Sequence, residues 1–421
     1  MQNAIRTAAV LVFAAAAALY FCRGDGGFLS RFTGEDIEYR WNESVLMHRG
    51  IDPFDVWAHK VEVPGFQGLI RPDMEEEMRG VPMVHAYAPW HSALTWFYGW
   101  MNRDVLRSLL FGLYAAILFC MVVKFYLVAR QGTDHPAPAT AFFAVLLLLP
   151  GTNNFHALNY GLLLAVVLWA MVHMVKRERE FLVSLCLVVM MFKPQIGLLF
   201  CWPLVAMGKT RAVVTAAAIC LALTCVPACV LGKSPIELIL QVPQLGAPYA
   251  TTFHAALLQM LITRLFGSNA PILWAIAMFA ACGAWTWSLR KKGDVLLMFL
   301  PASAIFPIWT YSRIHDVVIA WPIMLLVSLA LFRRNGYAPI QKFTFAMCAF
   351  PPVLISLVCG VFARKALAIA SSATGHDFSG AVDVLMCILD NRPYVFLFGS
   401  AMLLLSAVWL SLDSRRTQSG S

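Results

Sequence analysis

Charged residues are scarce in this 421-residue chain, and that scarcity excludes most classes of soluble protein. Asp, Glu, Lys and Arg make up 13% of the residues, whereas soluble domains carry about 25%. Hydrophobic residues reach 60%, and the mean hydropathy is +0.70. No stretch between the apolar segments is long enough for a separate soluble domain. We therefore expect one all-α, polytopic integral membrane domain over residues 1–421.

The chain also lacks the short motifs that mark several other protein classes. Its 11 cysteines include no CxxC pair and no Cys/His ligand spacing, so they are interpreted as small buried hydrophobic residues. The absence of a Walker loop and of a nucleotide-binding glycine pattern argues against an ATP-driven pump and a nucleotide-sugar donor. No Asp-x-Asp or Glu-x-Asp pair is present to bind a divalent cation. We expect no metal and no other cofactor.

Long apolar runs occupy most of the chain. A spanning helix needs about 20 apolar residues, and we expect about twelve transmembrane helices. The net charge of +9 comes from short basic clusters between the runs, which favour positive-inside topology over binding of nucleic acid. The clearest predicted spans are residues 5–22, 105–128, 212–231, 271–289, 314–332, 343–361 and 394–412.

Some apolar segments are too short for a full crossing. Residues 181–192 and 196–207 are joined by Lys193-Pro194-Gln195, and residues 139–149 end before Pro150. Short, Pro-broken segments at membrane depth are tolerated where they line protein or a water-filled cavity. We therefore expect an internal site open to the outer side. Residues 86–101, rich in Trp and Tyr, fit an interfacial segment as well as a span.

Residues 23–87 form the predicted first extracytoplasmic loop, which holds about half of the chain's 23 carboxylates. Within it, Ile37, Trp41 and Val45 recur every four residues, which predicts an amphipathic helix on the membrane surface. Thr33 fits its N-cap and Gly50 its C-terminal stop.

The strongest candidate for a catalytic residue in this helix is Asp36. A carboxylate there can act as a general base. Thr33-x-x-Asp36 also fits a capping box, in which Asp36 satisfies backbone donors only. Glu35 is the rival carboxylate.

Several motifs, in this order, resemble those of GT-C superfamily membrane glycosyltransferases, in particular glycosyltransferase family 87. The first is GEDIEYRWNESVLMHRGIDPFD, in which an Asp begins a helix that ends in a Gly-x-Asp-Pro-aromatic turn. The others are Tyr87-Ala88-Pro89, Asn159 with residues 162–164, Lys193-Pro194, and Ser312-Arg313-x-His315. The resemblance covers roughly residues 1–330. The chain departs from the family pattern at His156-Ala157, where Gly-Gln is expected, and at Trp90, where a second Pro is expected.

The resemblance implies a GT-C fold and an inverting transfer of one mannose- or arabinose-like sugar. The donor would be a polyprenyl-phosphate-linked sugar, and the acceptor a glycan or glycolipid on the extracytoplasmic face. The protein would lie in the inner (cytoplasmic) membrane with its active site facing the periplasm or exterior. Asp36 would be the catalytic base. Lys193, Arg313, His315 and Arg40 would bind the donor phosphate, and Glu35, Asn159, Tyr87 and His254 would line the pocket.

Each cation also has a structural interpretation. Lys193 and Arg313 sit near predicted span ends, where basic side chains snorkel to the interface. His315 adjoins Asp316 and can pair with it, and Arg40 can form an i,i+4 surface salt bridge with Asp36 worth about 0.3 to 0.5 kcal/mol. Two other functions also remain open. One is a flippase or transporter for lipid-linked saccharides, and the other is a polymerase or ligase that transfers whole glycan blocks.

Overall fold

The computed structural model describes residues 35–59, 61–64, 66, 81–82, 84, 87–241, 262, 269–309, 314–332, 404–405, 407–408 and 410–411. Every regular element in these ranges is helical, as expected for an all-α protein. Three helices are long and apolar enough to cross a membrane: α5 (Arg103–Gly132), α11 (Thr210–Leu231) and α14 (Ala270–Leu289). They coincide with three of the predicted spans. Residues 5–22 and 343–361 lie outside the described residues, so the total of about twelve crossings stays a prediction.

Most of the remaining helices of the bundle are shorter or broken. The break expected around Lys193 is confirmed, because α8 (Glu180–Met190) is followed by a turn and then by α9 (Pro194–Gly197). Residues 314–332 are not one continuous helix. The other elements are α6 (Pro136–Ala157), α7 (Gly161–Lys176), η4 (Leu198–Phe200), α10 (Cys201–Ala206), η6 (Arg290–Lys292), α15 (Val295–Trp309), η7 (Ile314–Ala320) and α16 (Trp321–Leu331).

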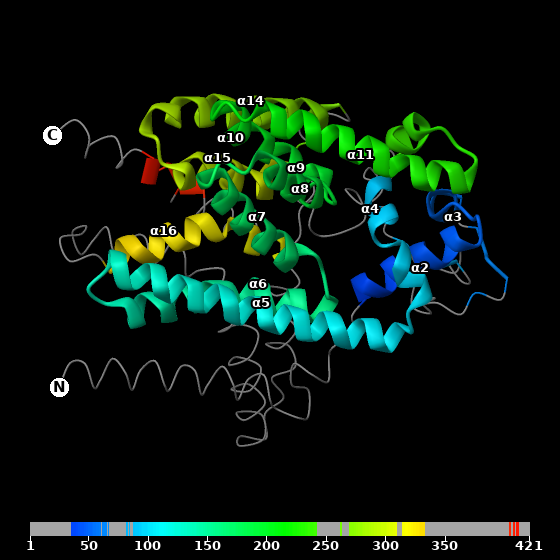
Figure 1. Cartoon of the computed structure of the whole chain (residues 1–421), viewed down its shortest axis with the longest axis horizontal. Coiled ribbons are helices and arrows are strands. Elements are labelled where there is room, and N and C mark those ends of the chain that lie inside the picture. The colour runs from blue at the N-terminus through cyan, green and yellow to red at the C-terminus, as the bar shows by residue number, and fades with distance from the viewer. Residues whose placement is uncertain are drawn as a thin grey trace, which may run out of the picture.

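The expected end of a helix at Pro150 is wrong. Helix α6 continues through this proline to Ala157. A proline inside a membrane helix is tolerated when neighbouring groups satisfy the backbone carbonyls that it leaves without a donor. The extra length of α6 carries the chain to the end of the molecule where α2 (Glu35–His48) lies (Figure 1).

The helices pack into one body with a continuous apolar core. Helices α5 and α6 run side by side along one edge, and α11 and α14 lie along the opposite edge with α7 to α10 between them (Figure 1). Aromatic rings join the layers: Phe125 of α5 stacks on Phe143 of α6 with ring centroids 4.2 Å apart. Trp169 of α7 stacks on Trp321 of α16 at 4.3 Å.

Helix α2 forms as predicted, but its environment differs from the expectation. Gly50 follows it with φ +70°, a left-handed conformation that suits glycine and ends the helix. The expected amphipathic surface helix, with its polar face outside, is wrong. Asp36, Glu38, Arg40, Asn42, Glu43 and Ser44 are all buried. The physical reason is that η3 (Trp96–Trp100), α4 (Pro89–Leu94), α5, α6 and α11 all pack against α2.

Residues 87–101 anchor α2, and they fold into the short helices α4 and η3 rather than into one long helix. The Trp41 indole N–H donates to the Met101 carbonyl at 3.0 Å. The Ser44 hydroxyl donates to the Trp96 carbonyl at 2.7 Å and accepts from the Gly99 N–H at 3.0 Å. These bonds fix the position and rotation of α2 at the end of the bundle.

Candidate functional site

Four buried polar side chains form a connected network at the α2 end of the bundle. The Asn159 amide Nδ2 donates a hydrogen bond to Asp36 Oδ2. Lys193 Nζ donates to Asn159 Oδ1 at 2.9 Å and to Asp316 Oδ1 at 2.5 Å. Each of the four residues is at most 4% exposed. Buried charges are stable only when they are paired and hydrogen-bonded, and this network supplies those partners.

The four residues come from four separate parts of the chain. Asp36 lies in the first turn of α2 and Asp316 in η7. Asn159 is in the three-residue link between α6 and α7, and Lys193 is in the turn between α8 and α9. The bundle therefore has to be assembled before the network exists.

The turn that carries Lys193 is held by close backbone packing. A Cβ on Gly197 would lie 2.8 Å from both the Met190 carbonyl oxygen and the Met191 nitrogen, so only glycine fits there. The Trp90 indole N–H of α4 donates to the Met191 carbonyl at 3.0 Å. Both contacts fix the turn, and with it the direction in which the Lys193 side chain projects from the backbone.

Arg40 is a second buried cation beside this network. Its Nη1 donates to both carboxylate oxygens of Glu43, at 2.7 and 2.9 Å. Its guanidinium lies 3.4 Å from the centre of the Tyr87 ring, a cation–π contact. Among the described residues, its Nε and Nη2 have no hydrogen-bond partner. An arginine that is 1% exposed and keeps unused donors is suited to binding an anion.

Both cations hold their protons despite burial. Burial lowers the pKa of Arg40, but Glu43, Tyr87, Tyr160 and Asp36 outweigh it and the pKa is raised. Burial likewise lowers the pKa of Lys193, and Asp316 and Tyr87 reverse that shift so that the pKa is raised. The site therefore has two positive charges at neutral pH.

Aromatic rings and one neutral histidine pack together beside the network. His91 is fully buried, and its Nε2 is hydrogen-bonded to the Tyr160 hydroxyl at 3.0 Å. Burial, with a smaller effect from Arg40, lowers the pKa of His91 well below its usual value, so the ring is neutral. Its ring also contacts Tyr87 and Phe192, with centroids 4.9 Å away in both cases.

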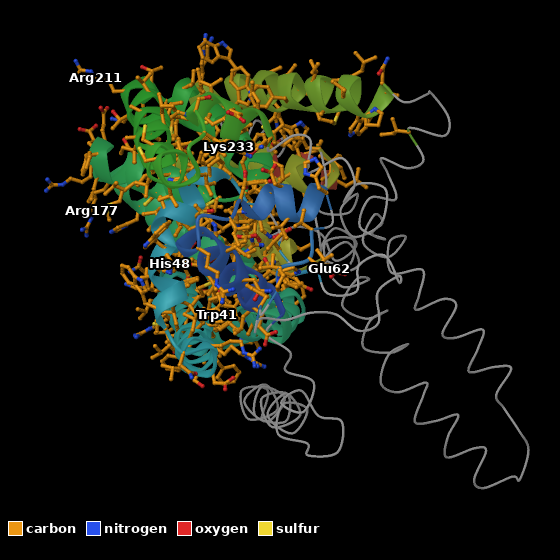
Figure 2. All side chains as sticks on the ribbon, turned by 90° about the vertical axis from the view of Figure 1, so that its right-hand side faces the viewer. Trp41, His48, Glu62, Arg177, Arg211 and Lys233 are labelled. Atoms are coloured by element: carbon orange, nitrogen blue, oxygen red, sulfur yellow. The ribbon has the colours of Figure 1, made fainter. Side chains whose placement is uncertain are left out.

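Ion pairs outside the network attach α2 and α3 (Pro53–Ala58) to the bundle. Arg107 of α5 contacts Glu38 of α2 at 3.1 Å. Lys233, just after α11, contacts Asp52 at 2.5 Å and Asp55 at 2.7 Å, at the start of α3. Figure 2 shows Lys233 on this end of the molecule, together with Trp41 and His48. Among the described residues, no group of three or more His, Cys, Asp or Glu side chains is placed to hold a metal ion.

The structure brings together five residues that the sequence had selected: Asp36, Arg40, Tyr87, Asn159 and Lys193. Arg313 and His254 lie outside the described residues. For Glu35 and His315 only the backbone is described, in α2 and η7. The capping role considered for Asp36 is also untested, because Thr33 is outside the described part of the chain.

Two of the structural interpretations from the sequence are wrong. Arg40 does not lie on the helix surface, because it is buried, and it pairs with Glu43 three residues on. Lys193 does not snorkel to an interface, because it is 4% exposed and its ammonium group is bound inside the protein.

Sequence reasoning assigned no role to Tyr160 or His91, and treated Asp316 only as a partner of His315. The available signal for Asp316 was its position as a lone carboxylate before a long apolar run. A buried acid next to such a run needs a cation, and Lys193 supplies it. For Tyr160 the signal was its position directly after Asn159.

Comparison with known protein families identifies the family of the chain. The family model described as Glycosyltransferase family 87 matches residues 85–309, just over half of the chain. The matched range includes Tyr87, His91, Asn159 and Lys193. A search of curated proteins and a search of solved structures gave no match. The length of the family match shows that the chain belongs to glycosyltransferase family 87.

Proposed function

We propose that this protein transfers a single sugar, mannose- or arabinose-like, from a polyprenyl-phosphate donor to a glycan or glycolipid acceptor. The family indicates a glycosyltransferase. The observation that carries the finer proposal is the arrangement of the Asp36 carboxyl group, joined through Asn159 to the buried cation Lys193, with Arg40 beside them. A carboxylate and two cations are the groups that displacement of a phosphate from a sugar requires.

In the proposed reaction, an acceptor hydroxyl oxygen attacks the anomeric carbon of the donor sugar. The bond between that carbon and the phosphate oxygen breaks, and its electron pair stays on the phosphate. The proton of the acceptor hydroxyl passes to the Asp36 carboxylate. Attack opposite the leaving group inverts the anomeric configuration. General-base catalysis of this kind contributes about 10²- to 10⁴-fold to the rate.

Arg40 and Lys193 are proposed to bind the phosphate and to stabilise the negative charge that it gains. Arg40 offers Nε and Nη2, which have no hydrogen-bond partner in the described part of the protein. Two parallel N–H groups of a guanidinium match two phosphate oxygens. Because protein cations supply this stabilisation, the proposal includes no metal ion.

A lipid-linked donor fits a site at the end of an apolar helix bundle. Helices α5, α11 and α14 are long and apolar enough to cross a membrane, so a polyprenyl tail can lie in the bilayer while its phosphate enters among the polar residues. We place the site on the periplasmic or exterior face of the inner membrane. This placement rests on the basic clusters between the apolar runs, which the positive-inside rule assigns to the cytoplasm.

The test is sugar transfer by the purified protein in lipid nanodiscs. Polyprenyl-phosphomannose and polyprenyl-phosphoarabinose serve as donors, with a membrane glycolipid extract as acceptor. We expect Asp36→Asn to remain folded and to lose about 10²- to 10⁴-fold in turnover, because the base is removed while the shape is kept. The matched control is Asp104→Asn in the first turn of α5, where the carboxylate is 76% exposed. The control should transfer sugar at the wild-type rate.

The products separate this proposal from its rivals. Mass spectrometry should find one added sugar residue on the acceptor, whereas transfer of a whole block would indicate a polymerase or ligase. Wild-type turnover by Asp36→Asn would exclude Asp36 as the base. Turnover with a nucleotide sugar and none with either lipid-linked donor would overturn the proposed donor class.

A further inference from the structure

Asn159 is the residue through which the proposed base and the proposed phosphate-binding lysine are connected. Its Oδ1 accepts two hydrogen bonds, from Lys193 Nζ at 2.9 Å and from the Gly161 backbone N–H at 3.0 Å. Both partners are donors only, so the amide oxygen has to face them. The Nδ2 group is therefore directed at Asp36. The hydrogen-bonding chemistry of the three partners fixes the orientation of the amide.

The backbone around Asn159 is held in an unusual conformation. Leu158, the preceding residue, has φ +50°, a left-handed conformation that is unfavourable for a residue with a Cβ. Such conformations persist where the surrounding structure enforces them, and they cluster at functional sites. Leu158 is 1% exposed and Asn159 is 3% exposed. The packing that fixes this turn also fixes the Asn159 amide.

We propose that Asn159 is a positioning residue for sugar transfer. Its amide sets the direction of the Asp36 carboxylate and, through its other end, the position of the Lys193 ammonium. The catalytic meaning of this inference rests on the proposed function. Asn159 itself exchanges no proton with the substrate. It holds the base and a phosphate-binding cation at a fixed separation, so that hydroxyl and phosphate are aligned on opposite sides of the anomeric carbon.

The alternative is that Asn159 serves only the fold, by capping the start of α7. Asn102 does this at the start of α5, where its Oδ1 accepts from the Asp104 N–H at 2.9 Å. Asn159 differs because its Nδ2 and one lone pair of its Oδ1 bind two charged side chains, and neither bond contributes to the cap. Asn102 is therefore the matched control.

The first experiment compares Asn159→Asp with Asn102→Asp in the transfer assay. Both substitutions keep an oxygen for the helix cap, but Asn159→Asp replaces the N–H donor facing Asp36 by a carboxylate oxygen. Two adjacent carboxylates share a proton, which raises their apparent pKa. The acid limb of the pH–rate profile should move to higher pH. Asn159→Ala should lower kcat by about 10²-fold, the effect of misplacing a reacting group by roughly 1 Å, with KM little changed.

Other titratable and charged groups near this network also influence the pH at which the acid limb lies. They are Arg40 and Glu43 of α2, Glu38 of α2 with Arg107 of α5, Tyr87 before α4, Tyr114 of α5, and Lys193 with Asp316. All of them are retained in Asn159→Asp. A shift of the acid limb in Asn159→Asp and not in Asn102→Asp therefore reports the contact with Asp36.

A second readout does not depend on turnover. In Asn159→Asp the shared proton is bound more tightly in the folded state than in the unfolded chain, where an Asp has a pKa of about 3.9. Relative to wild type, the variant should therefore gain thermal stability as the pH falls from about 7.5 towards 5. Asn102→Asp should show no such gain.

The two readouts distinguish the possible failures. Unchanged kcat and an unmoved acid limb in Asn159→Asp, in a protein that transfers sugar, would overturn the positioning role. If no lipid-linked donor is used but the stability gain appears, the Asn159–Asp36 contact is correct and the proposed function is wrong. If Asn159→Asp gains no thermal stability at lower pH, the Asn159–Asp36 contact is wrong, and the positioning role that depends on it is wrong too.

Discussion

The α2 end of the molecule and the outer flank of α5 reverse the usual distribution of polar and apolar side chains. In α2, Arg40 is 1% exposed and Asp36 is 4% exposed. On α5, Phe119 is 70% exposed and Leu109 is 58% exposed. Both helices are regular and both belong to one packed body. Their difference lies in what surrounds them.

The comparison shows that each region depends on a different environment. The charges of α2 are stable because protein groups replace water as their partners. The apolar side chains of α5 are stable on the outside because a bilayer core is as apolar as they are. A change that removes the partner in the first region, or that adds a charge in the second, should therefore destabilise the protein. The same changes on a water-exposed surface should have little effect.

The largest expected effect is that of Arg40→Met on stability. The substitution removes the cation that lies 2.7 Å from Glu43 inside the protein. Breaking a buried ion pair by removing one partner costs about 3–5 kcal/mol, because the other charge stays buried. The matched control is Lys209→Met, which removes a partly exposed pair with Glu180 at 3.3 Å and should cost about 0–1 kcal/mol. Thermal unfolding in nanodiscs measures both, and equal losses would contradict the contrast between buried and exposed pairs.

A somewhat smaller effect is expected for Phe119→Lys near the middle of α5. A lysine at the centre of a membrane helix costs roughly 2.5–3.5 kcal/mol on insertion scales. The yield of membrane-inserted, monodisperse protein should fall, whereas Phe119→Leu should leave it unchanged. If Phe119 faced water, the lysine would cost no more than about 0.5 kcal/mol. A normal yield for Phe119→Lys would show that this face of α5 does not contact lipid.

The smallest effect is expected from acidification, through His91. Because the pKa of this buried histidine is well below its usual value, the unfolded chain takes up a proton below about pH 6.5 that the folded protein does not. Stability is then lost as the pH falls, by about 1.4 kcal/mol per pH unit. His91→Phe should lose stability less steeply between pH 6.5 and 5.5. Thermal unfolding at both pH values provides the measurement, and parallel curves for the two proteins would argue against a neutral buried His91.

Local features of this chain could be predicted from its sequence. The recurrence of Ile37, Trp41 and Val45 with Gly50 beyond them predicted α2, and Lys193-Pro194 predicted the break after α8. Long apolar runs predicted α5, α11 and α14. In each case the signal lies within one short segment, where periodicity, glycine and proline act directly on the backbone.

The environment of the site could not be predicted in the same way. The burial of the polar face of α2 depends on η3, α4 and α5, which lie 41 or more residues beyond its end in the chain. The partner of Lys193 depends on η7 meeting the α8–α9 turn. The sequence pattern places a charge on a helix face, but it does not say whether water, lipid or a distant carboxylate will meet that face.

The separation of the network along the chain has a consequence for how the protein is made. Asp36 and Asn159 are 123 residues apart, and so are Lys193 and Asp316. At about 5–20 residues per second, each of these intervals takes roughly 6–25 s of synthesis. Lys193 follows Asn159 by only 34 residues. Lys193 is therefore synthesised well before Asp316, and until Asp316 is made the lysine lacks the carboxylate that it contacts directly in the folded protein.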